Sequence, residues 1–321
     1  MRRLLFGLLL LVAASVWVFQ YIAGSKIAAR FFPGVTIVRV YLHEENKVVR
    51  MQLEDYLVGV VAAEMPAEFP LEALKAQAVA ARTYVVKRLG AGGVANPLHP
   101  GADVCDDHRH GQAWLSREQL KSRWGTVQYY NYFYKVKRAV DETRGQVLTC
   151  QGELIDPAYH ASCGGRTENS EDVWKFKAPY LRSVPCPYEA NPNLVQDATF
   201  SFEQVDQALG TSLSAVPAAG KAKEPRELKV AEKTAAGRPK TLIIGSRQFP
   251  AVVVRDLLGL RSTNFTWKVE GDSVTFTTTG YGHGVGLCQY GAKGLAEHGY
   301  NYRTILGHYY SGVEITETKK N

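Results

Sequence analysis

The run from Leu4 to Ala23 constrains this chain more than any other feature of its sequence. It carries no charged side chain, follows Arg2 and Arg3, and is long enough to cross a bilayer as a helix. Basic residues stay on the cytoplasmic side of a membrane, so we expect the rest of the chain outside the cytoplasm. A cleaved signal peptide, with Ala23 and Ser25 at the cleavage site, is the alternative, and it leads to the same compartment.

The composition of the chain is that of folded, globular protein. Apolar residues make up 45% of its 321 residues and charged residues 21%, which excludes disorder over the whole length. The formal net charge of +7 is mild: it suits an anionic partner such as a membrane surface or a cell-wall polymer, and ordinary solubility explains it equally well. The five cysteines cannot all pair within the chain, so they are a partial bridge, metal ligands or buried thiols.

The pattern of apolar residues predicts an α+β fold. Two short strands are expected over 35–42 and 47–53, helices beginning near Asp55, Pro70 and Ser116, and further strands and a last helix near 146–148, 153–159, 265–269, 274–278 and 302–309. We expect a single-pass anchor over 1–25 and a two-lobed mixed domain with a substrate cleft. That domain is expected to comprise a first region over 35–187, an inserted module over 188–260 with a mobile basic segment, and a C-terminal part over 261–321.

Glu64 is the first candidate for chemistry. It follows three apolar residues at helical spacing, and a carboxyl on the apolar face of a helix is desolvated, which favours the protonated form that a general acid needs. A helix-end residue paired with a base such as Lys75 or Arg82 is the alternative. Arg82 itself lies at the edge of the apolar stripe of the next helix, where it orients a carboxylate, binds a sugar or lies on the surface.

A loop rich in Gly, Pro, Asp and His offers metal ligands. His99 and Cys105 are six residues apart, and His110 follows, so imidazole and thiolate donors acceptable to zinc come close together in sequence. Neither a C-x-x-C nor an H-E-x-x-H pattern is present, so an exposed polar loop is the alternative.

Two segments with glycine-rich turns complete the candidates. Ser162 precedes a double glycine but lacks the G-x-S-x-G pattern of a hydrolase, which favours a polar turn facing a cleft. The segment over 280–294 does not fit the glycine patterns of nucleotide-binding loops, and no nucleic-acid partner is expected. Its His283 and Gln289, beside Tyr290, suit a polar groove for a sugar; close backbone packing is the alternative.

Together, the segments over 54–88, 162–184 and 280–315 resemble the SpoIID family, that is, stage II sporulation protein D and its relatives. The segments contain EDYLVGVVAAEMP, SCGGRTENSEDVW and GYGHGVGLCQYGA in the same order as in that family. The resemblance runs from about residue 35 to residue 315 and is weakest between 188 and 260. An N-terminal membrane anchor also agrees with it.

This resemblance implies a membrane-anchored lytic transglycosylase. Such an enzyme cleaves the bond between N-acetylmuramic acid and N-acetylglucosamine in peptide-stripped peptidoglycan glycan strands and leaves 1,6-anhydro ends. It implies a place at the cell membrane, with the catalytic part between the mother-cell and forespore membranes during engulfment. The partners implied are a SpoIIP-type amidase and a SpoIIM-type membrane protein.

The resemblance also implies roles for single residues. The AAEMP segment makes Glu64 the catalytic acid, and substrate contacts fall on residues of the other matching segments, namely Arg82, Ser162, Tyr180, Arg182, His283 and Gln289. No metal is required for this chemistry.

Some relatives carry a His-x5-Cys-x5-Cys zinc motif. His99 and Cys105 match it, whereas Gly111 stands in place of the second cysteine, with His110 as the substitute ligand one residue earlier. A zinc ion held there is expected to be structural.

Two other functions remain open on the sequence. The same cleft would serve a non-catalytic glycan-binding scaffold that recruits an amidase. A zinc-dependent cell-wall peptidase or amidase would use the loop of His99 and Cys105, although the incomplete ligand set argues against it.

Overall fold

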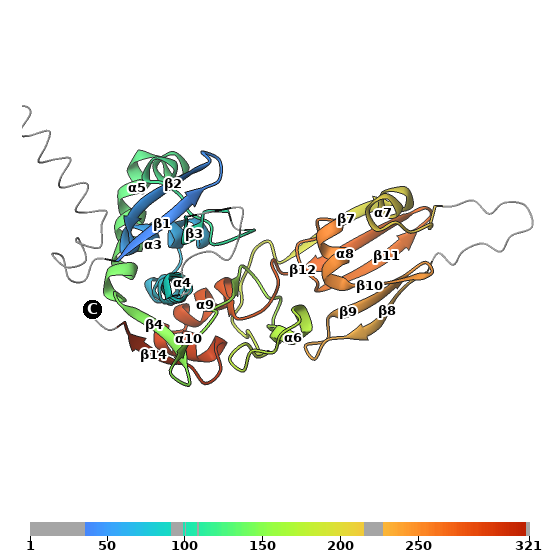
Figure 1. The fold of residues 1–321 in the computed structure, drawn as a ribbon. Coiled ribbons are helices and arrows are strands. Elements are labelled where there is room, and N and C mark those ends of the chain that lie inside the picture. The colour runs from blue at the N-terminus through green and yellow to red at the C-terminus, as the bar shows by residue number, and fades with distance from the viewer. Residues whose placement is uncertain (1–35, 91–98, 100, 108, 215–226, 319–321) are drawn as a thin grey trace, which may run out of the picture. The chain divides into compact units, whose positions relative to one another are not determined.

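The computed structural model describes residues 36–90, 99, 101–107, 109–214 and 227–318 (Figure 1). The expected anchor over 1–25 lies outside these residues. None of the helices within the described ranges is long and apolar enough to cross a membrane. Helices and strands both occur throughout, which confirms the α+β prediction. The chain divides into two compact units, each assembled from separate stretches of sequence.

The first unit contains the described residues up to Ala67, the stretch Ala81–Val147 and the end of the chain from Thr316. Its sheet has the order β2-β1-β3, antiparallel between β1 and β2 and parallel between β1 and β3. The elements of this unit are β1 (Ile37–Leu42), β2 (Lys47–Gln52), α3 (Leu53–Glu64), the second half of α4 (Leu71–Gly90), β3 (Val104–Cys105) and α5 (Arg117–Glu142).

Local sequence explains where these elements begin and bend. Ser116 caps α5, because its side chain accepts from the Gln119 backbone N–H while the Gln119 side chain accepts from the Ser116 N–H. Gly125 interrupts α5 with a φ of 69°, a conformation that a glycine adopts without strain. The apolar face of α3 lies in a core whose fully buried members include Val38, Val40, Tyr56, Leu57, Val60, Val61, Val136 and Val140.

The second unit contains Glu68–Ala80 and Leu148–Ile315. Two short sheets, β13-β6 and β14-β4-β5, accompany its helices. The elements outside its inserted part are most of β4 (Gln146–Cys150), β5 (Glu153–Leu154), β6 (Tyr159–His160), α6 (Ser170–Val173), β13 (Leu287–Cys288), α9 (Gln289–Glu297), α10 (Tyr302–Tyr309) and the first half of β14 (Glu314–Glu317).

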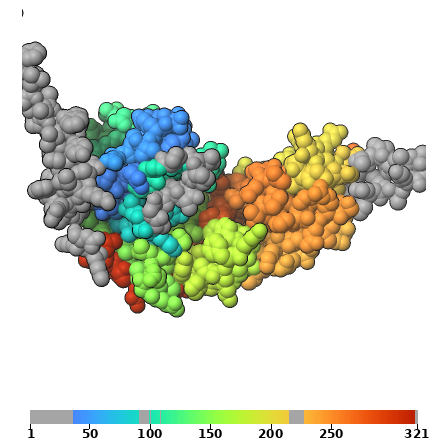
Figure 2. All heavy atoms as spheres, in the orientation of Figure 1, coloured from blue at the N-terminus to red at the C-terminus, as the bar shows by residue number. Residues whose placement is uncertain are grey.

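Within this unit, residues 195–279 form a module with a core of its own. Two antiparallel sheets, β10-β9-β8 and β11-β12-β7, pack with two helices around fourteen buried residues between Phe202 and Phe276. In the space-filling view the yellow atoms of the first part of the module, up to residue 214, lie directly against the orange atoms of its later part (Figure 2). The elements are β7 (Val195–Ser201), α7 (Phe202–Leu209), β8 (Leu228–Lys233), β9 (Pro239–Ile244), β10 (Arg247–Pro250), α8 (Ala251–Leu257), β11 (Phe265–Glu270) and β12 (Ser273–Thr279).

The structure changes two details of the predicted insertion. β11 and β12 share the core of the module, although the sequence analysis ended the insertion at residue 260. The basic segment expected to be mobile is also ordered in its second half, where β8 and β9 pair and Arg238 is 4% exposed. Arg238 can be buried because it forms an ion pair with Glu168, in which its Nε lies 3.0 Å from Glu168 Oε1. The two opposite charges compensate each other. Residues 215–226 lie outside the described part.

Candidate functional site

Glu64 is the last residue of α3 and is half-buried. The apolar residues that precede it on the same face are fully buried, so the helix is anchored right up to this carboxyl. Its Oε1 accepts a hydrogen bond from the backbone N–H of Ala113 at 2.9 Å. A carboxyl that is partly desolvated, fixed by a rigid backbone donor and still reached by solvent has the properties of a general acid and base.

The segment from Ala113 to Leu115 lies directly on α3. The Leu115 N–H donates to the Gly59 carbonyl at 3.4 Å. A Cβ atom at Gly59 would come within 2.3 Å of Trp114 Nε1 and 2.7 Å of the Leu115 carbonyl oxygen. Only glycine at this position lets the segment approach closely enough for Ala113 to reach Glu64.

Arg82 does not lie on the surface: its side chain is fully buried. Its Nε and Nη2 donate to Glu54 Oε1 and Oε2 at 3.1 and 2.7 Å. The same guanidinium reaches the Val140 and Gln146 carbonyls, at 3.1 and 3.3 Å. It therefore ties the start of α3 to the end of α5. The predicted substrate contact requires exposed surface that this guanidinium lacks here, and the carboxylate it orients is that of Glu54.

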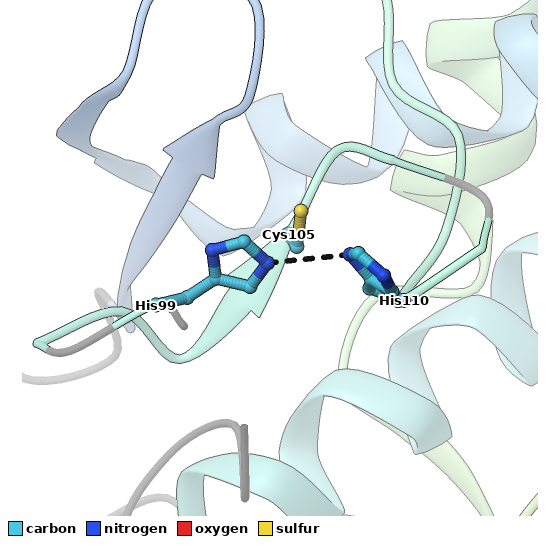
Figure 3. A group of neighbouring side chains, drawn as sticks. All are labelled: His99, Cys105 and His110. Carbon is cyan, nitrogen blue, oxygen red and sulfur yellow. Dashed lines mark hydrogen bonds between the residues drawn. The ribbon is translucent and has the colours of Figure 1, made fainter. Parts of the chain in front are cut away.

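The predicted metal ligands of the first unit come together. The side-chain donor atoms of His99, Cys105 and His110 all lie within 4.8 Å of one another. Figure 3 shows the two imidazole rings turned toward each other, with His99 Nε2 3.3 Å from His110 Nδ1 and the Cys105 side chain beside them. These three residues fit a zinc ion, since zinc is bound by imidazole nitrogen and thiolate sulfur.

The backbone at Gly111 leaves no room for a cysteine at the position where the zinc motif of some relatives has one. A Cβ atom there would lie 2.4 Å from the Cys105 carbonyl oxygen, so the backbone conformation of this loop admits no cysteine at that position. His110 is exposed and its ring reaches the group from the outer side. The loop continues directly into Gln112 and Ala113, so whatever holds the loop also holds the donor to Glu64.

In the second unit, Ser162 has an internal role. It is 1% exposed, and its Oγ donates to Glu189 Oε1 at 2.6 Å. The backbone N–H groups of Cys163 and Gly165 donate to the same carboxylate, each at 2.7 Å. Glu189, which the sequence analysis did not single out, thus fixes the glycine turn. The hydroxyl that was expected to face a cleft points into this network.

The glycine-rich segment over 280–294 is likewise held from within. His283 Nε2–H donates to the Tyr159 carbonyl at 3.0 Å, and its Nδ1 accepts from the Val285 N–H at 3.1 Å. Burial lowers the pKa of His283 to about 4, so the ring is neutral at physiological pH. Gln289 is 4% exposed and donates to Gln77 Oε1 at 3.4 Å.

Tyr180 and Arg182 are both partly buried. The Tyr180 hydroxyl accepts from the Asp156 N–H at 3.0 Å. Arg182 makes a two-fold contact with Glu171, at 2.6 and 2.5 Å, and this ion pair lowers the pKa of Glu171 to about 2. Of the predicted contacts in this unit, Ser162 and Gln289 are buried, whereas Tyr180, Arg182 and His283 are partly exposed.

Aromatic side chains that the sequence analysis passed over also lie on the surface of the second unit. The rings of Trp174 and Phe176 stack at 5.6 Å, and Phe176 is 53% exposed. The Trp174 ring also lies 5.1 Å from that of His283. Tyr281 is 51% exposed, with the Arg261 guanidinium 4.7 Å from its ring centre. The sequence signal for this aromatic surface was the pair Trp174 and Phe176, two residues apart in a polar loop.

A family model described as "Stage II sporulation protein" matches residues 41–150 of this chain. The chain is 38% identical over 281 residues to stage II sporulation protein D of Bacillus amyloliquefaciens, covering 87% of this chain and 78% of that protein. It is 36% identical over 295 residues to the protein of the same name from Bacillus subtilis, covering 92% and 83%. A third relative, "Amidase enhancer" of Bacillus subtilis, is 30% identical in an alignment of 309 positions that covers 81% of this chain and 40% of that protein.

Proposed function

Because this chain belongs to the stage II sporulation protein D family, we propose that it is a peptidoglycan lytic transglycosylase with Glu64 as its acid and base. Its substrate is the bond between N-acetylmuramic acid and N-acetylglucosamine in glycan strands stripped of stem peptides. The observation that carries the proposal is the half-buried Glu64 carboxyl fixed by the Ala113 N–H at 2.9 Å.

The reaction needs only one carboxyl. Glu64 donates its proton to the glycosidic oxygen as the bond to C1 of the muramic acid breaks. The resulting carboxylate then takes the proton of the C6 hydroxyl, whose oxygen bonds to C1 and closes the 1,6-anhydro ring. Glu64 ends protonated, as it began, and no water is consumed. Ordinary glycosidases need a second carboxylate because water must be activated or a nucleophile supplied.

The side chains that bind the glycan are those with surface accessible to it, not the buried polar residues. Trp174 and Phe176 offer aromatic faces, on which the apolar face of a sugar ring packs, and Tyr180 and Arg182 add polar groups in the same unit. Ser162, His283 and Gln289 support this surface by fixing the two glycine-containing segments. Arg82 acts as a positioning residue for α3, the helix that carries Glu64.

We place the protein at the cell membrane, anchored by its N-terminal run, with both units outside the cytoplasm. There it would act beside a SpoIIP-type amidase, which removes the stem peptides, and a SpoIIM-type membrane protein. A zinc ion held by His99, Cys105 and His110 would be structural, because it would stabilise the loop that leads to Ala113. None of the steps above passes through it.

The relative named "Amidase enhancer" supports a second function. In this second function, our chain binds glycan and recruits or stimulates an amidase without cutting the strand. A zinc-dependent peptidase or amidase is the third reading, and it would depend on the loop of His99 and Cys105.

The test uses protein beginning at Lys26, peptide-free glycan strands and mass spectrometry, with the Glu64→Gln variant alongside. We expect ends lighter by one water than hydrolysis products, and their loss in the variant, while binding to glycan is retained. Gln cannot donate or take the proton but keeps the shape of the side chain.

The other outcomes separate the alternatives. Ordinary reducing ends would identify a hydrolase. Binding without cleavage by both proteins, combined with stimulation of an added amidase, would identify the scaffold. Release of stem peptides that stops on chelation would identify the zinc enzyme.

A further inference from the structure

Four buried side chains of the kinds that bind metal, one histidine and three cysteines, lie in the interior of the second unit. They are His160, Cys163, Cys186 and Cys288, which are 4%, 1%, 4% and 0% exposed. All three thiols are free. The residues come from β6, from the turn that follows it, from the segment after Arg182 and from β13. They share no member with the loop of His99 or with the carboxyl of Glu64.

The register of a parallel strand pair brings the first two together. In the pair formed by β6 and β13, His160 lies opposite Cys288, so both side chains leave the ladder on the same face. The ring nitrogen of His160 and the sulfur atoms of Cys163 and Cys288 lie within 4.8 Å of one another. The ligand atoms of a tetrahedral zinc site are about 3.5 to 3.8 Å apart, so a small contraction closes this group on an ion.

The tautomer of His160 points a lone pair into the group. Its Nδ1–H donates to the Val285 carbonyl at 3.1 Å, which leaves Nε2 as the acceptor. Nε2 finds no hydrogen-bond partner among the residues that the structure describes. A buried polar atom without a partner is costly, and a histidine held through its other nitrogen by a carbonyl is the usual arrangement of a metal ligand.

Cys186 is the neighbouring thiol that offers a fourth donor. Its Sγ lies outside the set of three whose donor atoms are within 4.8 Å of one another, and it contacts the Tyr309 hydroxyl at 3.1 Å. Gly291 keeps the approach close: a Cβ atom there would lie 2.9 Å from Cys186 Sγ, and the Gly291 N–H donates to Cys288 Sγ at 3.3 Å. Backbone N–H donors to sulfur stabilise thiolates, the form in which cysteine binds metal.

We propose that His160, Cys163, Cys186 and Cys288 bind one Zn²⁺ ion in a tetrahedral Cys3His site. Its donor set is that of closed structural zinc sites, with no position left for substrate. Binding replaces the three thiol protons, which pass to solvent, and gives the His160 Nε2 lone pair its partner. A disulfide within the group would use two sulfurs and leave the third thiol and Nε2 as they are.

The charged neighbours of the group are compatible with this ion. The thiols of Cys163 and Cys288 now donate to Glu189, at 3.4 and 3.2 Å. Glu189 loses these two donors on metal binding but keeps the Ser162 hydroxyl and two backbone N–H groups. The buried guanidinium of Arg238 donates to the Cys163 carbonyl at 2.6 Å and adds positive charge beside the thiolates.

The site explains how a region with little regular structure is held. Cys163 belongs to the turn after β6, and Cys288 is the N-cap residue of α9 within the glycine-rich segment. The ion therefore ties together the two conspicuous motifs of the second unit. This holds whether or not Glu64 cleaves glycan.

The test measures zinc per chain in the full-length protein, purified in mild detergent without added chelator. A His99→Ala/Cys105→Ser background removes the candidate loop site. We expect about one zinc per chain to remain in this background, and the further change Cys163→Ser or Cys288→Ser to lower it toward zero. Cys150→Ser, which alters a thiol outside the group, serves as the matched control and leaves the zinc content unchanged.

Two further variants identify the fourth ligand. Cys186→Ser is expected to lose the zinc, whereas Glu189→Gln is expected to keep it. His160→Cys, which restores a four-donor set, is expected to keep zinc, while His160→Gln loses it. The reverse behaviour of the Cys186 and Glu189 variants would overturn the donor set.

Two measurements on the unaltered group keep the proposal testable if a variant fails to fold. Cobalt introduced into the background protein is expected to show the intense bands of tetrahedral thiolate coordination; weak octahedral bands would overturn the proposal. The background protein keeps four of the five cysteines of the chain, because Cys105 is replaced by serine. We expect all four thiols to be free after denaturation without reductant. Two free thiols would show a disulfide instead, and absence of zinc from the background protein would equally overturn the site.

Discussion

The ion pair of Arg82 and Glu54 is largely buried, so breaking it costs more than breaking a pair on the surface. Arg82 is 0% exposed and Glu54 15%. We expect Arg82→Met to destabilise the protein by about 3 kcal/mol, because it leaves the largely buried carboxylate of Glu54 without its ion-pair partner. Urea unfolding of the purified variant measures this change.

A second ion pair on the same helix is the matched control. Arg117 lies 3.9 Å from Asp55, and both side chains are more than half exposed. Arg117→Met is expected to change the free energy of unfolding by less than about 1 kcal/mol. An equal effect of the two substitutions would contradict the assignment of Arg82 as a buried positioning residue. So would a folded Arg82 variant whose only defect is weaker glycan binding.

Sequence reasoning predicted the position of Glu64 at the end of a helix with a buried face, which the structure shows. The catalytic role of Glu64 stays a prediction. Ser162, His283 and Gln289 were expected to face a sugar, but each is committed to an internal partner. Whether a polar side chain turns inward depends on partners distant in sequence, such as Glu189 for Ser162, and no local pattern shows them.

Among elements, the contact between α3 and the segment over 113–115 has the most direct consequence for Glu64. We expect Gly59→Ala to destabilise the protein by about 1 to 3 kcal/mol, since the new methyl group would overlap Trp114 and the Leu115 carbonyl. It should also lower kcat more than it weakens glycan binding, because displacement of the segment breaks the bond from Ala113 to Glu64. Unfolding curves and glycan cleavage assays check the two effects.

Gly90 provides the control for this substitution. It is the last residue of α4 and has open space where a Cβ atom would lie. Gly90→Ala is expected to leave cleavage unchanged and to be neutral or slightly stabilising, because alanine favours helix more than glycine. An unaltered cleavage rate in a folded Gly59→Ala protein would show that the segment does not position Glu64.

The elements themselves were largely predictable. β1, β2, α3, α4 and α10 lie where alternating or helical apolar spacing placed them, and the capping residue Ser116 marked the start of α5. α9 was missed, because Gly291 and Gly294 argue against a helix. Both are needed there for packing: a Cβ atom would lie 2.0 Å from the Tyr309 hydroxyl oxygen at Gly291, and 1.8 Å from the Tyr188 carbonyl oxygen at Gly294. Tertiary contact overrode local propensity.

At the scale of the molecule, the chain enters and leaves the module of 195–279 at the same place. Val195 and Thr279 are partners in the pairing of β7 with β12, and the Gly280 N–H donates to the Leu194 carbonyl at 2.7 Å. Neighbouring ends and a separate core are the marks of an inserted domain. We therefore expect residues 195–279, expressed alone, to fold and to unfold cooperatively in urea.

Phe276→Ala tests whether the core of this fragment is the one described. Phe276 is fully buried between aromatic neighbours, and its truncation is expected to destabilise the fragment by about 3 kcal/mol. A fragment without a cooperative transition, or one indifferent to this change, would contradict an independent module.

We expect loss of the module to destabilise the rest of the second unit more than loss of that rest destabilises the module. Arg238 becomes solvated when the module is expressed alone, which costs little, whereas Glu168 in the remainder loses both Arg238 and Thr234, which contact its Oε1 at 3.0 Å. Joining Leu194 to Gly280 by a short glycine linker should therefore yield a remainder less stable than the whole protein. Glu168→Gln in that shortened chain should recover part of the loss, because it removes the unpaired charge. Unfolding midpoints of the two shortened proteins measure the recovery, and a lower midpoint for the Gln variant would show that this charge is not what the module neutralises.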